Sequence, residues 1–118
     1  MKLCIVVPCY NESEVLPETV KRLTEKMSVL TDSGKLESGS KIVFVDDGSK
    51  DGTWELIEKY RLEFESVEGI KLSRNRGHQN ALFAGLMTVK DGFDAVVSMD
   101  ADLQDDMETA ESMIKFII

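Results

Sequence analysis

Short apolar runs punctuate this chain at regular intervals. They predict four buried strands, over residues 2–8, 41–46, 69–73 and 94–99. Each run is the length of an ordinary strand, and its apolar residues are consecutive rather than alternating. Consecutive apolar positions indicate strands that are covered on both faces of the sheet.

The segments between these runs predict helices. Residues 13–30 place an apolar side chain every three or four positions, which is typical of an amphipathic helix. Further helices are predicted over about 53–65 and 78–90, and another from Met107 onward. Residues 31–40 hold three serines and two glycines and predict an exposed loop.

Strands and helices therefore alternate, which predicts an α/β fold with a Rossmann-like, mostly parallel sheet in one domain over residues 1–118. In such sheets ligands bind at the carboxyl ends of the strands. Polar clusters follow the predicted strands at Tyr10–Glu12, Asp46–Ser49, Arg74–His78 and Asp100–Asp105.

Charge narrows the classes of partner. The 118 residues carry 14 basic and 22 acidic side chains, a net charge of −8, which argues against nucleic acid because a duplex binder needs a basic face. A phosphate ligand stays compatible, since a metal ion and a few local cations can override the global sign. Cys4 and Cys9 lack metal-ligand spacing and are predicted to be reduced packing residues.

Asp100 and Asp102 follow the fourth predicted strand with one residue between them. Carboxylates at this spacing can converge on one divalent cation where the chain turns, and hard oxygen ligands favour Mg²⁺ or Mn²⁺. Gln104 adds a nearby oxygen. On these residues alone, a plain polar turn before the next helix is the alternative.

Asp47 follows the second predicted strand. Its carboxylate could accept a hydrogen bond from the imino N–H of a pyrimidine or guanine base. The alternative is an Asx turn with an N-cap for the helix at Thr53. Asp51 and Thr53 themselves are predicted to be turn and capping residues.

Two further clusters suit a nucleotide. Pro8 is expected to close the first strand, Tyr10 to pack against a base or ribose, and Glu12 to begin a helix, where the dipole favours a carboxylate with or without a ligand. Two cations, Arg74 and Arg76, and the only histidine, His78, stand before a helix N-terminus, which suits an anionic phosphate. Surface charge is the alternative for this cluster.

Together, four segments resemble the family 2 glycosyltransferases of the GT-A fold: VVPCYNE (6–12), VDDGSKDGT (45–53), LSRNRGHQNALFAGL (72–86) and MDADLQDD (99–106). The nearest likeness is to enzymes that move a sugar from a nucleotide sugar to a polyprenyl or dolichyl phosphate, such as dolichol-phosphate mannose synthase. The two prolines that often follow this last motif in the family are missing here.

The resemblance implies a role for each matched residue, with Asp47 reading the base and Asp102 as the principal metal ligand. The residues implied to bind the nucleotide sugar are Pro8, Tyr10, Glu12, Val45, Asp47, Arg74, Gly77, Asp100 and Ala101. The residues implied to bind Mg²⁺ or Mn²⁺ are Asp100, Asp102 and Gln104.

The implied reaction is metal-dependent, inverting transfer of a hexose from a UDP- or GDP-linked sugar to an acceptor, polyprenyl phosphate being favoured. The chain is expected to be the N-terminal, donor-binding part of a domain about twice as long. The general base is expected beyond Ile118, so this part alone is expected to be inactive. The longer protein is expected on the cytoplasmic side and associated with the membrane.

Two other functions compete with transfer. The first is a nucleotide-sugar-binding module without transferase activity. The second is a nucleotidyltransferase, which is disfavoured because no Gly-rich loop bearing Arg or Lys follows the first strand directly.

The tail from Met107 places Met113, Ile114 and Ile117 on one apolar face. Such a face indicates that a partner covers it, and that partner could be a second copy of the chain in a homo-oligomer.

Overall fold

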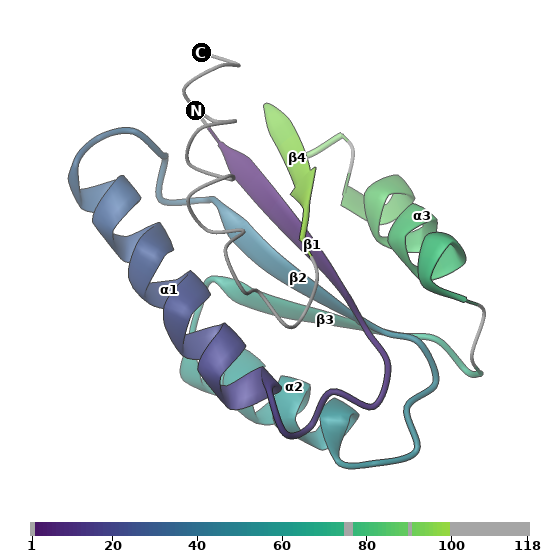
Figure 1. Cartoon of the computed structure of the whole chain (residues 1–118). Helices are drawn as coiled ribbons and strands as arrows, with labels where there is room; N and C mark the ends of the chain where they lie inside the picture. The colour runs from purple at the N-terminus through teal and green to yellow at the C-terminus, as the bar shows by residue number, and fades with distance from the viewer. Residues whose placement is uncertain (1, 75–76, 90, 100–118) are drawn as a thin grey trace.

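A single parallel sheet forms the centre of the molecule in the computed structural model, which describes residues 2–74, 77–89 and 91–99. Its strands are β1 (Leu3–Cys9), β2 (Lys41–Asp46), β3 (Val67–Lys71) and β4 (Ala95–Ser98). They are ordered β3-β2-β1-β4, so the chain steps outward from β1 to β3 and then returns to the far side of β1 (Figure 1). The predicted α/β fold with a parallel sheet is confirmed.

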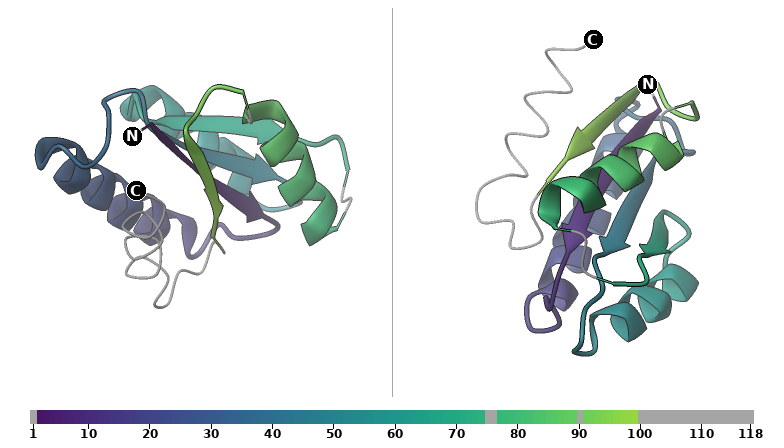
Figure 2. Two further views of the ribbon diagram at one scale, coloured as in Figure 1. Left: turned by 90° about the horizontal axis from the view of Figure 1, so that it is seen from above. Right: turned by 90° about the vertical axis from the view of Figure 1, so that its right-hand side faces the viewer.

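Helices cover both faces of this sheet. α1 (Leu16–Asp32) and α2 (Thr53–Glu63) lie on one face, and α3 (His78–Val89) lies on the other (Figure 2). The larger core cluster packs α1 and α2 against the sheet and includes Leu16, Leu23, Phe44 and Ile57. The smaller one packs α3 and includes Val6, Val45 and Ala81. This double cover explains why all seven residues of β1 are buried.

Pro8 lies inside β1, so the prediction that it closes the strand is wrong. Pro8 is the register partner of Val45 on β2. In a parallel strand, alternate residues bond to opposite neighbours. The carbonyl of Val6 accepts from Met99 on the β4 side, so Pro8, two residues on, also faces that side. Its missing N–H therefore removes no bond between β1 and β2.

The first helix begins later than its apolar periodicity predicts. α1 starts at Leu16 rather than at residue 13, and it runs two residues beyond the predicted end. Pro17 stands in its first turn, where a missing N–H costs nothing. The carbonyl of Glu12 accepts from the amides of Val15 and Leu16, so Glu12 lies in the turn before the helix rather than at its start.

The third strand is also displaced, because β3 covers Val67–Lys71 rather than 69–73. Pairing sets its limits, with Ile42 opposite Val67 and Asp46 opposite Lys71. Glu68 and Gly69 look unlike strand residues, but β3 is an edge strand and its partly exposed faces tolerate them. Gly69 is also needed for packing, because a Cβ there would lie 2.6 Å from Cγ2 of Ile57.

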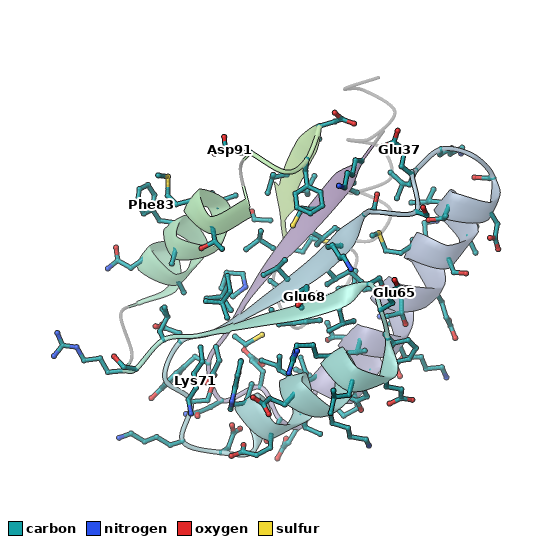
Figure 3. All side chains as sticks on the ribbon, turned by 180° about the vertical axis from the view of Figure 1, so that it is seen from behind. Glu37, Glu65, Glu68, Lys71, Phe83 and Asp91 are labelled. Carbon is teal, nitrogen blue, oxygen red and sulfur yellow. The ribbon has the colours of Figure 1, made fainter. Side chains whose placement is uncertain are left out.

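The outer face of α3 is partly apolar. Phe83 is 62% exposed and Met87, one turn further on, is 48% exposed. Figure 3 shows Phe83 on the side of α3 away from the sheet. Within the described residues, none of the helices has the length and apolar character that a membrane crossing requires. The helix predicted from Met107, with its apolar face, lies outside the described residues.

Candidate functional site

The carboxyl ends of the strands come together around β1. Cys9, the last residue of β1, is the register partner of Asp46, the last residue of β2. One residue further, the amide of Asp47 donates to the carbonyl of Cys9 at 2.8 Å. On the other side of β1, the amide of Met99 donates to the carbonyl of Val6 at 3.0 Å. The chain reverses its direction of progress between β1 and β4, which is where open α/β sheets bind ligands.

Side chains tie the loop after β1 to the loop after β2, and Figure 1 shows these two loops side by side. The amide of Asn11 donates to Oγ of Ser49 at 2.9 Å, and Oδ1 of Asn11 accepts from the amide of Lys50 at 2.8 Å. Asn11 has a φ of 52°, a left-handed conformation that Asn adopts more easily than most residues. No individual role is predicted for Asn11 or Ser49 from sequence, although Asn after a strand end is a turn signal.

Asp51 joins the same two loops at positions further along the chain. One of its carboxylate oxygens accepts from Oγ of Ser13 at 2.7 Å and from the Ser13 amide at 3.2 Å. The other accepts from the amide of Thr53 at 3.0 Å and from the Thr53 hydroxyl. Burial alone would raise the pKa of Asp51, but these hydrogen bonds from Thr53 and Ser13 lower it to about 2. The prediction of Asp51 as a turn residue is confirmed.

Asp47 makes a longer-range contact. Its side chain is only 3% exposed, and Oδ2 accepts from the amide of Gly77 at 3.0 Å. Gly77 has a φ of 91°, which favours glycine, and α3 begins at the next residue. The turn before α2 is made by Asp51, so Asp47 joins β2 to the loop after β3 instead. Asp47 thus lies where three strand ends meet.

The other predicted nucleotide-binding residues within the described part of the chain differ in how exposed they are to solvent. Pro8 and Val45 are register partners and both are buried in the sheet. Tyr10 is 40% exposed beside them at the end of β1. Glu12 is half-buried, and its amide donates to Oγ1 of Thr53 at 2.9 Å. Arg74 is exposed in the loop between β3 and α3.

Asp46 is a buried carboxylate for which the sequence predicts no individual role. Oδ1 accepts from the amide of Ser49 at 3.3 Å, whereas Oδ2 has no hydrogen-bond partner in the described structure. Cys9 is a buried free thiol, and burial, followed by the charges of Glu12 and Asp46, raises its pKa. Burial raises the pKa of Cys4 to about 12. The prediction of two reduced packing cysteines agrees with this burial.

The predicted metal ligands Asp100, Asp102 and Gln104, together with Ala101, lie outside the described residues. The described chain ends at Met99, which β1 holds at the carboxyl edge of the sheet. Among residues 2–74, 77–89 and 91–99, no group of three or more His, Cys, Asp or Glu side chains is placed to hold a metal ion. The metal ligands therefore remain a prediction from sequence.

Comparison with protein families identifies one match, to the family described as "Glycosyl transferase family 2", over residues 4–118. The glycosyltransferase YkoT of Bacillus subtilis (strain 168) is 50% identical over 115 residues, covering 97% of this chain and 34% of that protein. An undecaprenyl-phosphate 4-deoxy-4-formamido-L-arabinose transferase of Salmonella choleraesuis (strain SC-B67) is 36% identical over 114 residues, covering 96% and 32%. The chain thus spans about a third of the length of these relatives.

Solved structures share the fold. The mannosyltransferase PcManGT from Pyrobaculum calidifontis, in complex with GDP-Man and Mn²⁺, aligns with a TM-score of 0.68 at 22% identity, covering 86% of this chain and 27% of that one. TarS 1-349 of S. aureus, in complex with UDP, aligns with a TM-score of 0.66 at 23% identity, covering 98% and 32%. At these identities the likeness establishes a common fold.

Proposed function

Because the chain belongs to glycosyl transferase family 2, we propose that it binds the donor in the transfer of a hexose from a nucleotide-diphosphate sugar to an acceptor. The observation that carries this proposal is the buried carboxylate of Asp47, held by Gly77 at the carboxyl end of β2, the strand next to β1. A carboxylate fixed there suits the imino N–H of a base. Tyr10, exposed on the neighbouring loop, supplies an aromatic face for the base or ribose.

The diphosphate is proposed to lie at the end of β4. Asp100, Asp102 and Gln104 would hold Mg²⁺ or Mn²⁺, and their carboxylate and amide oxygens are the donor set that these ions prefer. Such an ion, when bound, supplies charge neutralisation to a leaving diphosphate. Arg74 and Gly77 would line the pocket wall on the β3 side, next to Asp47.

The acceptor is proposed to be a polyprenyl phosphate. Relatives 34–36% identical carry the name of undecaprenyl-phosphate transferases, which supports a lipid phosphate over a soluble hydroxyl acceptor. Direct displacement by the acceptor oxygen would invert the anomeric carbon. A lipid acceptor also implies that the longer protein works at a membrane surface, on the side where nucleotide sugars are available.

Nucleotide binding with and without metal tests the proposal. Calorimetry with UDP and with GDP should give binding in Mn²⁺ and much weaker binding in EDTA. Asp102→Asn should weaken binding more than the matched control Glu108→Gln. Asp47→Ala should lose about 1.5–3 kcal/mol of binding free energy, the range for hydrogen bonds to charged groups. Equal affinity in EDTA would contradict the metal role, and no binding of either nucleotide in Mn²⁺ would contradict the donor site.

Transfer itself is tested on the longer protein with labelled nucleotide sugar and polyprenyl phosphate. Radiolabel in the lipid fraction would support transferase activity. A protein that binds nucleotide in a metal-dependent way and yields no labelled lipid would favour the alternative function, a nucleotide-sugar-binding module.

A further inference from the structure

Hydrogen bonds of Asn11 with Ser49 and Lys50 link the loop after β1 to the loop after β2. We propose that Asn11 and Ser49 are positioning residues, which hold Tyr10 and Glu12 in place beside Asp47 before a nucleotide arrives. This inference rests on the proposed function, because it assigns Asn11 and Ser49 to the same nucleotide site. Neither residue belongs to the set predicted to touch the ligand.

The contact between the loops is reciprocal. The backbone N–H of Asn11 donates to Oγ of Ser49 at 2.9 Å, and the side-chain Oδ1 of Asn11 accepts from the backbone N–H of Lys50 at 2.8 Å. Ser49 is fixed in turn, because its own amide donates to Oδ1 of the buried Asp46 at 3.3 Å. The loop after β1 is thereby anchored to a side chain that cannot move without disturbing the end of β2.

Asn11 also adopts a costly backbone conformation. Its φ of 52° lies in the left-handed region, which strains L-residues, although Asn adopts it more easily than most. Its side chain is exposed, so burial in the core does not compensate this cost. The hydrogen bonds to Ser49 and Lys50 do compensate it, and strain maintained by specific contacts is common at binding sites.

The residues on either side of Asn11 are the ones whose positions matter. Tyr10 precedes it and Glu12 follows it, and the Glu12 amide is held by Oγ1 of Thr53 at 2.9 Å. A turn fixed at Asn11 therefore determines where Tyr10 and Glu12 lie relative to Asp47. Ordering a loop before binding spares the ligand the entropy cost of ordering it, which raises affinity without any direct contact.

Substitutions in the linkage separate positioning from stability. Asn11→Gly keeps the left-handed conformation accessible and removes the amide side chain. Ser49→Ala removes the hydroxyl, and Ser49→Thr restores it. The destabilised control is Ser40→Ala, because Oγ of Ser40 accepts the Leu3 amide at 2.9 Å in a buried position at the amino end of β1.

Dissociation constants for UDP and GDP in Mn²⁺ are measured by calorimetry at a temperature where every variant is folded. Asn11→Gly and Ser49→Ala should each weaken binding about tenfold, the loss expected for one hydrogen bond near the upper end of its usual range. Ser49→Thr should remain within about twofold of the unmodified chain. Asn11→Gly removes the bond from the Lys50 amide, and Ser49→Ala removes the bond from the Asn11 backbone N–H. Because losing either bond is expected to release the loop, the double variant Asn11→Gly/Ser49→Ala should bind only slightly more weakly than either single variant.

Three results would count against the inference, each in a distinct way. If the unmodified chain binds neither nucleotide, the proposed function fails and the inference fails with it. If it binds and both linkage variants bind equally well, only the inference fails. If Ser40→Ala weakens binding as much as Asn11→Gly at a matched loss of Tm, general destabilisation explains the effect and the positioning role is overturned.

Discussion

Gly85 controls how closely α3 approaches the sheet, and replacing it with alanine is expected to destabilise the protein. A Cβ at position 85 would lie 2.6 Å from Cγ1 of Val6 and 2.9 Å from Cγ2 of Val45. Favourable carbon–carbon contacts lie at about 3.5–4.0 Å. Both valines are fully buried on central strands, and β-branched side chains have little χ1 freedom. The helix must therefore move outward.

Two opposing effects set the size of the stability loss in Gly85→Ala. Alanine is favoured over glycine in a helix interior by about 1 kcal/mol. Overpacking a filled core costs about 1–3 kcal/mol, and a contact as short as 2.6 Å to a rigid side chain belongs at the upper end of that range. The net loss in unfolding free energy is expected to be about 1–2 kcal/mol. Thr88→Ala on the exposed side of α3 is the control and should leave stability nearly unchanged.

Urea unfolding followed by circular dichroism measures this loss, and a double variant tests its cause. Val6→Ala alone should cost about 2 kcal/mol by leaving a cavity. In Val6→Ala/Gly85→Ala the new methyl group occupies that space, so the combined loss should fall short of the sum by about 1 kcal/mol. A Gly85→Ala variant at least as stable as the unmodified chain would refute the reasoning, as would strict additivity.

The same substitution reaches the candidate site. α3 starts immediately after Gly77, whose amide donates to Asp47 at 3.0 Å. Outward movement of α3 would lengthen this contact, so Gly85→Ala should weaken nucleotide binding and Val6→Ala/Gly85→Ala should restore part of it. Thr88→Ala should bind as the unmodified chain does.

Three further predictions concern single groups. Gly77→Ala should cost about 1–2 kcal/mol of stability through its φ of 91° alone, since nothing lies within 4 Å of the added Cβ; an unchanged urea midpoint would contradict this. Because the folded-state pKa of Asp51 is lowered to about 2 from 3.8, its stabilising contribution is present above about pH 4 and lost as the pH falls toward 2; acid unfolding of Asp51→Asn should lack that part of the pH dependence. Burial raises the pKa of Cys4 to about 12 and that of Cys9 also, so both thiols should react with a thiol reagent at pH 8 only after unfolding in guanidinium, and rapid labelling of the native chain would contradict the buried neutral thiols.

The alternation of strands and helices could be predicted from sequence because a strand that is buried on both faces of the sheet is a continuous apolar run. β1 and β2 are continuous apolar runs for that reason. β3 was displaced by two residues because pairing with β2, rather than its own composition, decides that Glu68 and Gly69 lie in the strand. The start of α1 was misplaced because apolar periodicity says nothing about Pro17, which fits only the first turn.

The candidate site could likewise be predicted only in part. Asp47 follows a buried strand directly, so its place at a strand end could be predicted from its position in the sequence. Its contact with Gly77 joins residues 30 positions apart and depends on where α3 packs, which no local pattern encodes. The hydrogen bonds of Asn11 with Ser49 and Lys50 cannot be predicted for a similar reason, because they join residues 38–39 positions apart on neighbouring loops.

The strand order also decides how the two halves of the proposed donor site are spaced. β1 lies between β2 and β4, and each neighbour is bonded to it at the carboxyl edge, through Asp47 to Cys9 and through Met99 to Val6. Neighbouring strands are about 4.8 Å apart, so β2 and β4 are separated by about 10 Å across the sheet. Asp46 lies opposite Cys9 whereas Ser98 lies opposite Val6, so β4 also ends about 10 Å earlier along the strand direction, and the two strand ends are about 14 Å apart. Asp47 stands at one end of that span and Met99 at the other, and Asp100 is the residue that follows Met99 in the sequence. A nucleotide likewise separates its base from its phosphates by a ribose, so one ligand lying across the end of β1 would meet a base-reading carboxylate and a metal-binding segment together. Tyr10 and Asn11 follow the end of β1, beneath the middle of that span, which is why the linkage through Asn11 is expected to affect the affinity for the whole nucleotide.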